Sequence, residues 1–183
     1  MTEEVWCNEI LKITSRLDDR KQAAILLLQQ PQLLEYTLDF LRKTSDRELI
    51  TKSAYAIDQA LRMNIVVLIP YKMLFFEALR KLQRDTEKRI FAKIIELISG
   101  AHLENKFPLH PGERKLLIEQ AFEWLINDEK VAVKVFAMQC LYNLRNAQNS
   151  IIPELTAQLE QQFSEAGPAF QSRARHILKK LKN

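Results

Sequence analysis

The sequence contains very little glycine, three residues in 183. Glycine-rich loops are the usual way for backbone N–H groups to approach a phosphate, so this scarcity excludes a P-loop and a dinucleotide-binding turn. Cysteine is scarcer still, because Cys7 and Cys140 stand alone without a CxxC pair. A disulfide scaffold and a cysteine-rich zinc site are therefore not expected, and this cysteine usage fits a reducing cytoplasm.

Long apolar runs are missing as well. The longest, at residues 65–69, stops at Pro70, and the acidic Glu3 and Glu4 stand where a signal peptide needs basic residues. We therefore expect a cytoplasmic protein that is neither exported nor membrane-spanning. A strong charge of one sign is also lacking: 27 Lys and Arg against 23 Asp and Glu give a net charge of only +4. That balance permits nucleic acid as a partner without implying it.

Leu, Ile, Ala, Gln, Glu, Lys and Arg, the residues that lose least on entering a helix, are abundant. Prolines divide this helical sequence into a repeat, since Pro31, Pro70, Pro111 and Pro153 follow one another at intervals of 39, 41 and 42 residues. Proline costs no hydrogen bond in the first helical turn, so each predicts a helix start. A second start signal follows in each segment, and these signals are Asp46, Asp85, Asp128 and Pro168, the aspartates as N-caps.

The repeat predicts an all-α fold, an α-α superhelix or solenoid of about five antiparallel helix pairs. We expect one continuous domain over residues 1–183. Its segments are a terminal pair at 1–30 and repeats at 31–69, 70–110, 111–152 and 153–183.

The period and the Ile-Pro entries resemble the HEAT and armadillo class of helical repeats over nearly all of the chain. Three stretches carry a closer resemblance: FEWLINDEKVAVKV at 122–135, IPEL at 152–155 and SRARHILKKL at 172–181. They are similar to a group of short uncharacterised bacterial HEAT-like proteins that often carry the label adenylosuccinate lyase. That label implies release of fumarate from adenylosuccinate. True lyases of that name use a serine loop of the Ser-Ser-x-Met-Pro-x-Lys-x-Asn type, and this sequence has no Ser-Ser pair.

We therefore expect no enzyme and no cofactor. Helical solenoids expose long surfaces made from one helix of each repeat, and these surfaces mostly hold other macromolecules. The first hypothesis is a non-catalytic protein-binding or scaffold module whose partner is another protein or peptide. Its candidate anchors on the second helices are Tyr55, Arg89 and Trp124.

The alternative is a nucleic-acid-binding or DNA-repair-type HEAT-like protein. Its candidate surface is a basic cluster that straddles a predicted turn, together with the basic helix after Pro168. The acidic residues nearby reduce the local charge, and most charge runs are solvated faces. The cluster consists of Arg80, Lys81, Arg84, Lys88, Arg89 and Lys93.

The remaining chemistry-bearing residues favour structural roles. The longest irregular stretch is expected at residues 99–112, where His102, Glu104 and His110 have no spacing that would preorganise metal ligands. Cys140 is expected in the core. An apolar stripe predicts that Phe122 is buried and that Trp124 lies at the stripe's margin.

Overall fold

The computed structural model describes residues 1–182, and this part of the chain contains ten α-helices, one 3₁₀ helix and no strand. The all-α prediction is therefore confirmed. The chain divides into two compact units, residues 1–91 and 92–183. The single domain expected from length stays a prediction.

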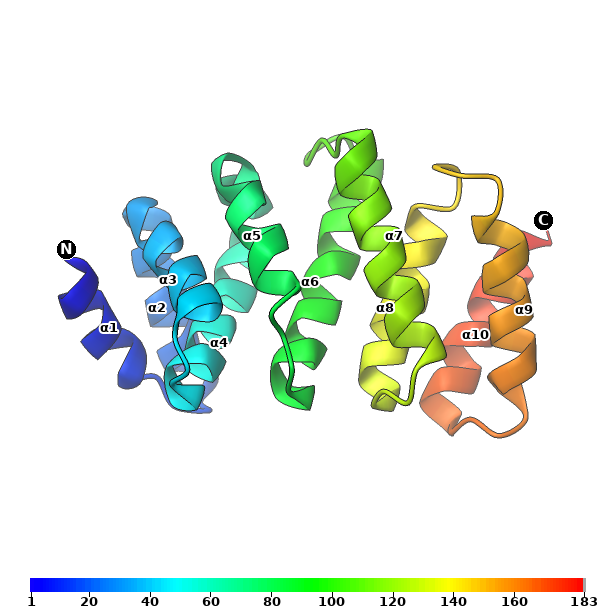
Figure 1. Cartoon of the computed structure of the whole chain (residues 1–183), viewed down its shortest axis with the longest axis horizontal. Coiled ribbons are helices and arrows are strands. Elements are labelled where there is room, and N and C mark those ends of the chain that lie inside the picture. The colour runs from blue at the N-terminus through cyan, green and yellow to red at the C-terminus, as the bar shows by residue number, and fades with distance from the viewer. Residues whose placement is uncertain (183) are drawn as a thin grey trace. The chain divides into compact units, whose positions relative to one another are not determined.

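The first unit is a double layer of helices. Figure 1 shows α3 and α5 toward the viewer, with α2 and α4 behind them. The α-helices are α1 (Glu3–Leu11), α2 (Leu17–Gln29), α3 (Gln32–Lys43), α4 (Arg47–Met63), α5 (Lys72–Leu79) and the start of α6 (Asp85–Leu103), and the 3₁₀ helix η1 (Ile65–Tyr71) precedes α5.

A buried tryptophan of α1 connects this helix to α3. Trp6 is fully buried, and its indole N–H donates to Thr37 Oγ1 at 2.8 Å. Thr37 in turn donates to the Leu33 carbonyl at 2.6 Å, so both polar groups are satisfied inside the core. Farther along, Phe75 stacks on Phe91 with ring centroids 5.4 Å apart. These contacts join α1 to α3 and α5 to α6.

The second unit repeats the layering, with α7 and α9 toward the viewer and α8 and α10 behind them (Figure 1). Its helices are the rest of α6 together with α7 (Pro111–Ile126), α8 (Val131–Asn143), α9 (Ile151–Phe163) and α10 (Pro168–Leu181). Arg173 of α10 joins three helices, because it donates to Glu96 of α6 at 3.2 Å and to Gln139 of α8 at 2.8 Å.

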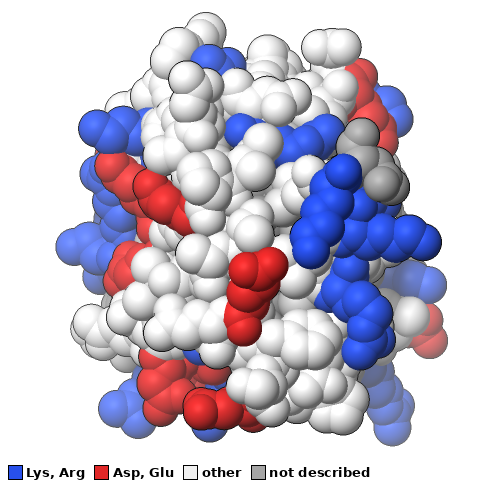
Figure 2. Space-filling model, turned by 90° about the vertical axis from the view of Figure 1, so that its right-hand side faces the viewer, with Lys and Arg blue, Asp and Glu red and all other residues white. Residues whose placement is uncertain are grey.

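The outer side of α10 is basic. Arg175, Lys179 and Lys182 are exposed at spacings of four and three residues, which place them on one side of the helix. The sequence of α10 contains no acidic residue. Figure 2, which faces the end of this unit, shows Lys and Arg side chains gathered along one side.

Several predicted helix starts are confirmed. Asp46 caps α4, since its carboxylate accepts from the N–H groups of Glu48 at 2.9 Å and Leu49 at 3.1 Å. Helices α7 and α10 begin at Pro111 and Pro168. At Asp46 the cap satisfies N–H groups that have no partner within the helix, and at Pro111 and Pro168 proline lacks an N–H that would have had no helical partner.

Two predicted starts are wrong. Pro70 does not open an α-helix but lies inside η1, which Asn64 begins by accepting from the Val66 N–H at 3.2 Å. Asp128 is not an N-cap, because the turn after α7 continues to Lys130, and α8 begins at Val131. In both places the α-helix begins later than predicted, at Lys72 for α5 and at Val131 for α8.

The irregular stretch is also shorter than the predicted range 99–112. Helix α6 continues to Leu103 and ends in a Schellman motif. In this motif Asn105 adopts a left-handed conformation with φ 58°, its N–H bonds to the His102 carbonyl, and the Lys106 N–H bonds to the Ala101 carbonyl. The connection therefore covers only residues 104–110.

Within residues 1–182, no single helix has both the length and the apolar character needed to cross a membrane. One pair, α4 and the segment from η1 through α5, has this length and apolar character when the two are taken together, but they are bent by 119° relative to each other.

Candidate functional site

The first unit contains a groove of about 360 Å³ beside α4, which we call the α4 groove. Three separate parts of the chain line it: the turn after α1, the outer side of α4, and the residue before α6. The lining residues are Ile13, Thr14, Ser15, Arg47, Glu48, Thr51, Lys52, Tyr55 and Arg84.

The polar wall of the groove comes from the helical register of α4. Arg47, Thr51 and Tyr55 follow one another at four-residue spacing and therefore share one side of the helix. The opposite side is apolar, with Ala56 and Ile57 fully buried in the unit's core. Burial of that side fixes the rotation of α4, and so turns the polar line toward the groove.

Lys52 connects α4 to the end of α1. Its ammonium donates to the Leu11 carbonyl and forms an ion pair with Glu48 at 2.7 Å. The Leu11 carbonyl belongs to the last turn of α1, where carbonyls lack helical partners and a cation is favoured. Lys52 thus holds the turn after α1 against α4 and leaves its charge at the groove wall.

Tyr55 is held by a cation. The Arg20 guanidinium lies 3.8 Å from the centre of the Tyr55 ring, within the range of a cation–π contact. The ring itself is half-buried. One face of the ring is therefore covered by Arg20 of α2, and the remaining exposed part of Tyr55 lines the groove.

A buried carboxylate underlies the groove where α4 meets α6. Glu87 is only 1% exposed, and its Oε1 accepts a hydrogen bond from the Thr51 hydroxyl. Nη1 of Arg84 lies 3.5 Å from that same oxygen and 3.5 Å from Thr51 Oγ1. Because Thr51 and Arg84 line the groove and Glu87 is buried beneath them, the groove surface presents Arg84 rather than the acid.

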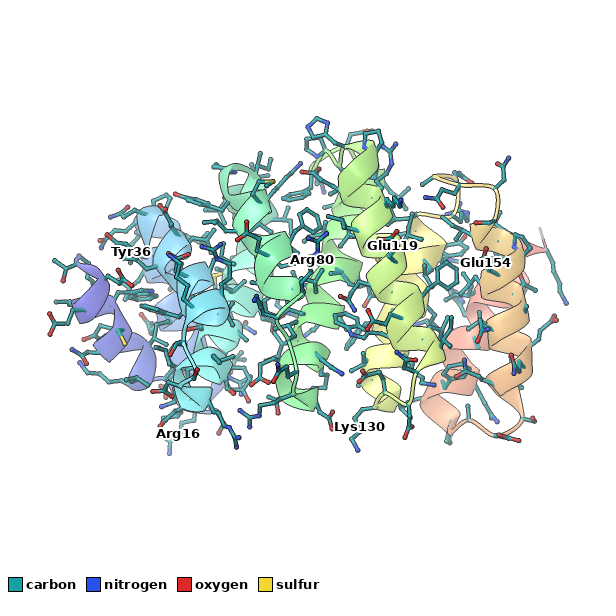
Figure 3. The ribbon with its side chains drawn as sticks, viewed as in Figure 1. Arg16, Tyr36, Arg80, Glu119, Lys130 and Glu154 are labelled. Atoms are coloured by element: carbon teal, nitrogen blue, oxygen red, sulfur yellow. The ribbon has the colours of Figure 1, made fainter. Side chains whose placement is uncertain are left out.

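The turn between α1 and α2 shapes the other wall. Thr14 donates to the Asp19 carboxylate, and the Arg16 N–H donates to Thr14 Oγ1 at 3.1 Å. Arg16 itself is the N-cap residue of α2 and lies at this turn in Figure 3. The turn is thereby closed locally, and the exposed Ser15 hydroxyl lines the groove beside it.

Cations outnumber acids along the lining. Arg47, Lys52 and Arg84 carry positive charge, and Glu48 is the acidic residue among the lining side chains. Within residues 1–182 Arg47 has no ion-pair partner, so its guanidinium is available to a ligand. With Tyr55 and the hydroxyls of Thr51 and Ser15, the groove can accept a chain carrying carboxylates, through hydrogen bonds and charge together.

The structure brings together two residues that the sequence assigned to different hypotheses, Tyr55 and Arg84. The other cations of the predicted basic cluster do not line the groove. Arg80 is exposed at the end of α5 (Figure 3), and Lys81 and Arg89 are exposed as well. Lys88 and Lys93 are half-buried and make further interactions of their own, and Lys93 belongs to the second unit.

The prediction for the apolar stripe of α7 is wrong. Trp124 is 3% exposed and lies in the core, whereas Phe122 is half-buried. The buried line runs through Leu117, Ala121 and Trp124, at spacings of four and three residues. Trp124 also lies on α7, the first helix of its segment and not a second helix as predicted, and it offers little surface to a partner in this structure.

Sequence reasoning missed Arg47, Thr51 and Lys52. The four-residue spacing from Arg47 to Tyr55, after a predicted cap at Asp46, would have identified the polar line of α4. No sequence signal locates Ser15 or Arg84 next to that line, because these contacts depend on how the helices pack.

The other sequence candidates have structural surroundings. Cys140 is fully buried as expected, and burial raises the pKa of its thiol to about 12. Cys7 is half-buried. His110 is the N-cap residue of α7, and its backbone N–H donates to Glu113 Oε2 at 2.8 Å. Over residues 1–182, no three His, Cys, Asp or Glu side chains form a group that could hold a metal ion.

Comparison of the chain with protein-family profiles, curated proteins and solved structures gives no match.

Proposed function

We propose that this chain is a non-catalytic binding module of the HEAT-like kind, and that the α4 groove holds an extended acidic segment of another protein. The observation that carries the proposal is that Arg47, Lys52 and Tyr55 of α4 line one groove together with Arg84, which immediately precedes α6. This combination suits a peptide with carboxylate side chains, because arginine pairs with carboxylates in a fixed geometry and tyrosine supplies rigid contact area.

The order of the helices supports the HEAT-like part of the proposal. Two α-helices correspond to each of the segments 1–30, 31–69, 70–110, 111–152 and 153–183, except that α9 begins at Ile151, two residues before the last segment. Each unit also has its helices in two layers (Figure 1). We infer an α-α superhelix of about five antiparallel pairs, an architecture in which the second helices line a binding surface.

Charge supports the choice of partner. Water screens exposed charges strongly, but the guanidinium groups of Arg47 and Arg84 line the same groove, so one ligand can meet both at once. A neutral peptide would leave these cations solvated and gain only the contact with Tyr55. Acidic side chains are therefore the feature that the groove selects.

Fluorescence anisotropy with a short labelled peptide rich in Glu and Tyr tests the proposal, with Gln in place of every Glu in a second peptide. The acidic peptide is expected to bind and the Gln peptide to lose most of that affinity. In the double variant Arg47→Gln and Arg84→Gln, affinity for the acidic peptide is expected to fall at least about tenfold.

The double variant Arg80→Gln and Arg89→Gln is the matched control, because it removes the same charge from exposed arginines outside the groove. Circular dichroism establishes that both variants are folded. Equal loss of affinity in both variants would mean that net charge alone attracts the peptide, and the groove assignment would be abandoned.

The basic side of α10 favours a second function, binding of nucleic acid. Arg175 and Lys179 of α10 and Lys182 directly after it are exposed, and α10 contains no acidic residue; phosphate backbones bind such lines of cations by releasing counterions. The first unit's Arg80, Lys81 and Arg89, which are also exposed, form a separate candidate surface for nucleic acid.

Titration of labelled single-stranded and duplex oligonucleotides at several salt concentrations tests this alternative. Replacing Arg175 and Lys179 by Gln is expected to lower the slope of log K against log salt by about 0.9 for each lost contact to duplex phosphate. No binding at low salt, or an unchanged slope, excludes this function for α10.

A further inference from the structure

The second unit has a pocket of about 280 Å³ that the proposed function does not use, and we call it the His102 pocket. It lies between the end of α6, the first turn of α7 and the turn after α8. Its polar lining residues are His102, Arg114, Asn143 and Asn146, and Leu103, Leu144 and Ala147 supply an apolar side. None of these side chains is acidic.

The backbone of Leu109 holds the side chains of both His102 and Arg114 at the pocket. The Leu109 N–H donates to His102 Nδ1 at 3.3 Å, and the Leu109 carbonyl accepts from Arg114 Nη1 at 3.1 Å. The Leu109 side chain is buried, so the backbone that makes these two hydrogen bonds is anchored in the core of the unit. His102 and Arg114 therefore have defined positions before any ligand arrives.

The two hydrogen bonds to Leu109 also determine which donors of His102 and Arg114 remain for a ligand. Because Nδ1 of His102 accepts the Leu109 N–H, the neutral imidazole carries its hydrogen on Nε2, which is a donor. Arg114 uses one N–H on Leu109 and keeps the others. Asn143 is already occupied, since it donates to Ser99 at 3.0 Å and accepts from Gln139 at 2.8 Å, and it serves as a fixed wall.

We propose that the His102 pocket binds a small organic molecule in which a carboxylate is joined to a short apolar body. The carboxylate pairs with Arg114 and accepts from the His102 Nε2–H, and the apolar body lies against Leu103 and Leu144. A planar carboxylate suits a guanidinium that can offer two parallel N–H groups. The volume is at the lower limit of small-molecule sites, which favours a ligand with few heavy atoms.

Calorimetric titration of the full chain tests this site. The probes are hexanoate, which has both features of the proposed ligand, acetate and inorganic phosphate, which lack the apolar body, and hexanol, which lacks the charge. Hexanoate is expected to give saturable binding, and the other three probes are expected to bind at least about tenfold more weakly. Equal binding of phosphate or hexanol, or no saturation with hexanoate, overturns the proposal.

Two variants locate the binding. Arg114→Gln is expected to weaken hexanoate at least about tenfold, and Arg114→Lys, which keeps the charge without the planar fork, to recover part of that loss. Lys115→Gln is the matched control, since it removes an exposed cation from the next position, outside the pocket.

Amide NMR spectra provide a second readout. With hexanoate, the Leu109 N–H resonance is expected to shift in the unmodified chain and in Lys115→Gln, but much less in Arg114→Gln. Equal weakening in the Lys115 and Arg114 variants would refute the site. None of these results depends on the α4 groove, so the two proposals fail separately.

Discussion

Removal of one hydroxyl from Thr51 tests how the buried carboxylate beneath the α4 groove is stabilised. In the substitution Thr51→Val the side chain keeps its shape, but Glu87 loses the hydroxyl that donates to its Oε1. Arg84 at 3.5 Å is a long contact to that same oxygen and only partly replaces the donor. Hydrogen bonds to a charged group contribute about 1.5–3 kcal/mol, so we expect the free energy of unfolding to fall by about 2 kcal/mol.

Urea unfolding followed by circular dichroism measures this loss directly, and thermal unfolding provides a second measure. For a chain of this size each kcal/mol corresponds to a shift of about 2–4 °C in Tm. Combining Thr51→Val with Glu87→Gln gives a double-mutant cycle, in which we expect a coupling of about 1 kcal/mol or more. A loss below about 0.5 kcal/mol for Thr51→Val, with no coupling to Glu87, would refute the account of this carboxylate, since uncoupled sites are additive to about that level.

Three further predictions follow from local geometry. Asn105→Ala is expected to lower stability by about 1–2 kcal/mol because only Gly and Asn readily adopt the left-handed conformation with φ 58°, and Asn105→Gly should lose little; urea unfolding of both separates the backbone effect from a side-chain effect. The Cys140 thiol, with its pKa raised to about 12 by burial, should react with a thiol reagent at neutral pH only after unfolding, and rapid labelling in the native protein would contradict its burial. Burial also raises the pKa of Asp58 above 3.8, with Arg62 offsetting only part, so the folded state binds this proton more tightly than the unfolded state. As pH rises from 3.8 through the folded-state pKa, the free energy of unfolding should therefore fall relative to Asp58→Asn, and parallel pH profiles would show that the pKa is not raised.

The sequence predicted the helical class and several helix starts because those depend on short-range chemistry. Asp46, Pro111 and Pro168 act within a single turn, where a cap or a missing N–H has the same effect in any surroundings. Pro70 fails as a signal because the 3₁₀ turn that contains it is begun by Asn64, several residues earlier.

The candidate site was only partly predictable. Tyr55 and Arg84 were selected from the sequence, but their common position depends on the packing of α4 against the turn after α1 and the start of α6. Trp124 shows the same limit in the opposite direction, because a residue at the predicted margin of a stripe becomes buried when neighbouring helices cover that margin.

The two tryptophans, Trp6 and Trp124, are both buried, and one lies in each unit. Each indole is therefore an intrinsic fluorophore whose emission moves to longer wavelength when its own unit opens to water. Trp124→Phe leaves a chain whose emission reports on the first unit, and Trp6→Phe leaves one that reports on the second. Equilibrium unfolding curves of this pair, corrected for the stability cost of each substitution, measure directly whether the two units unfold together.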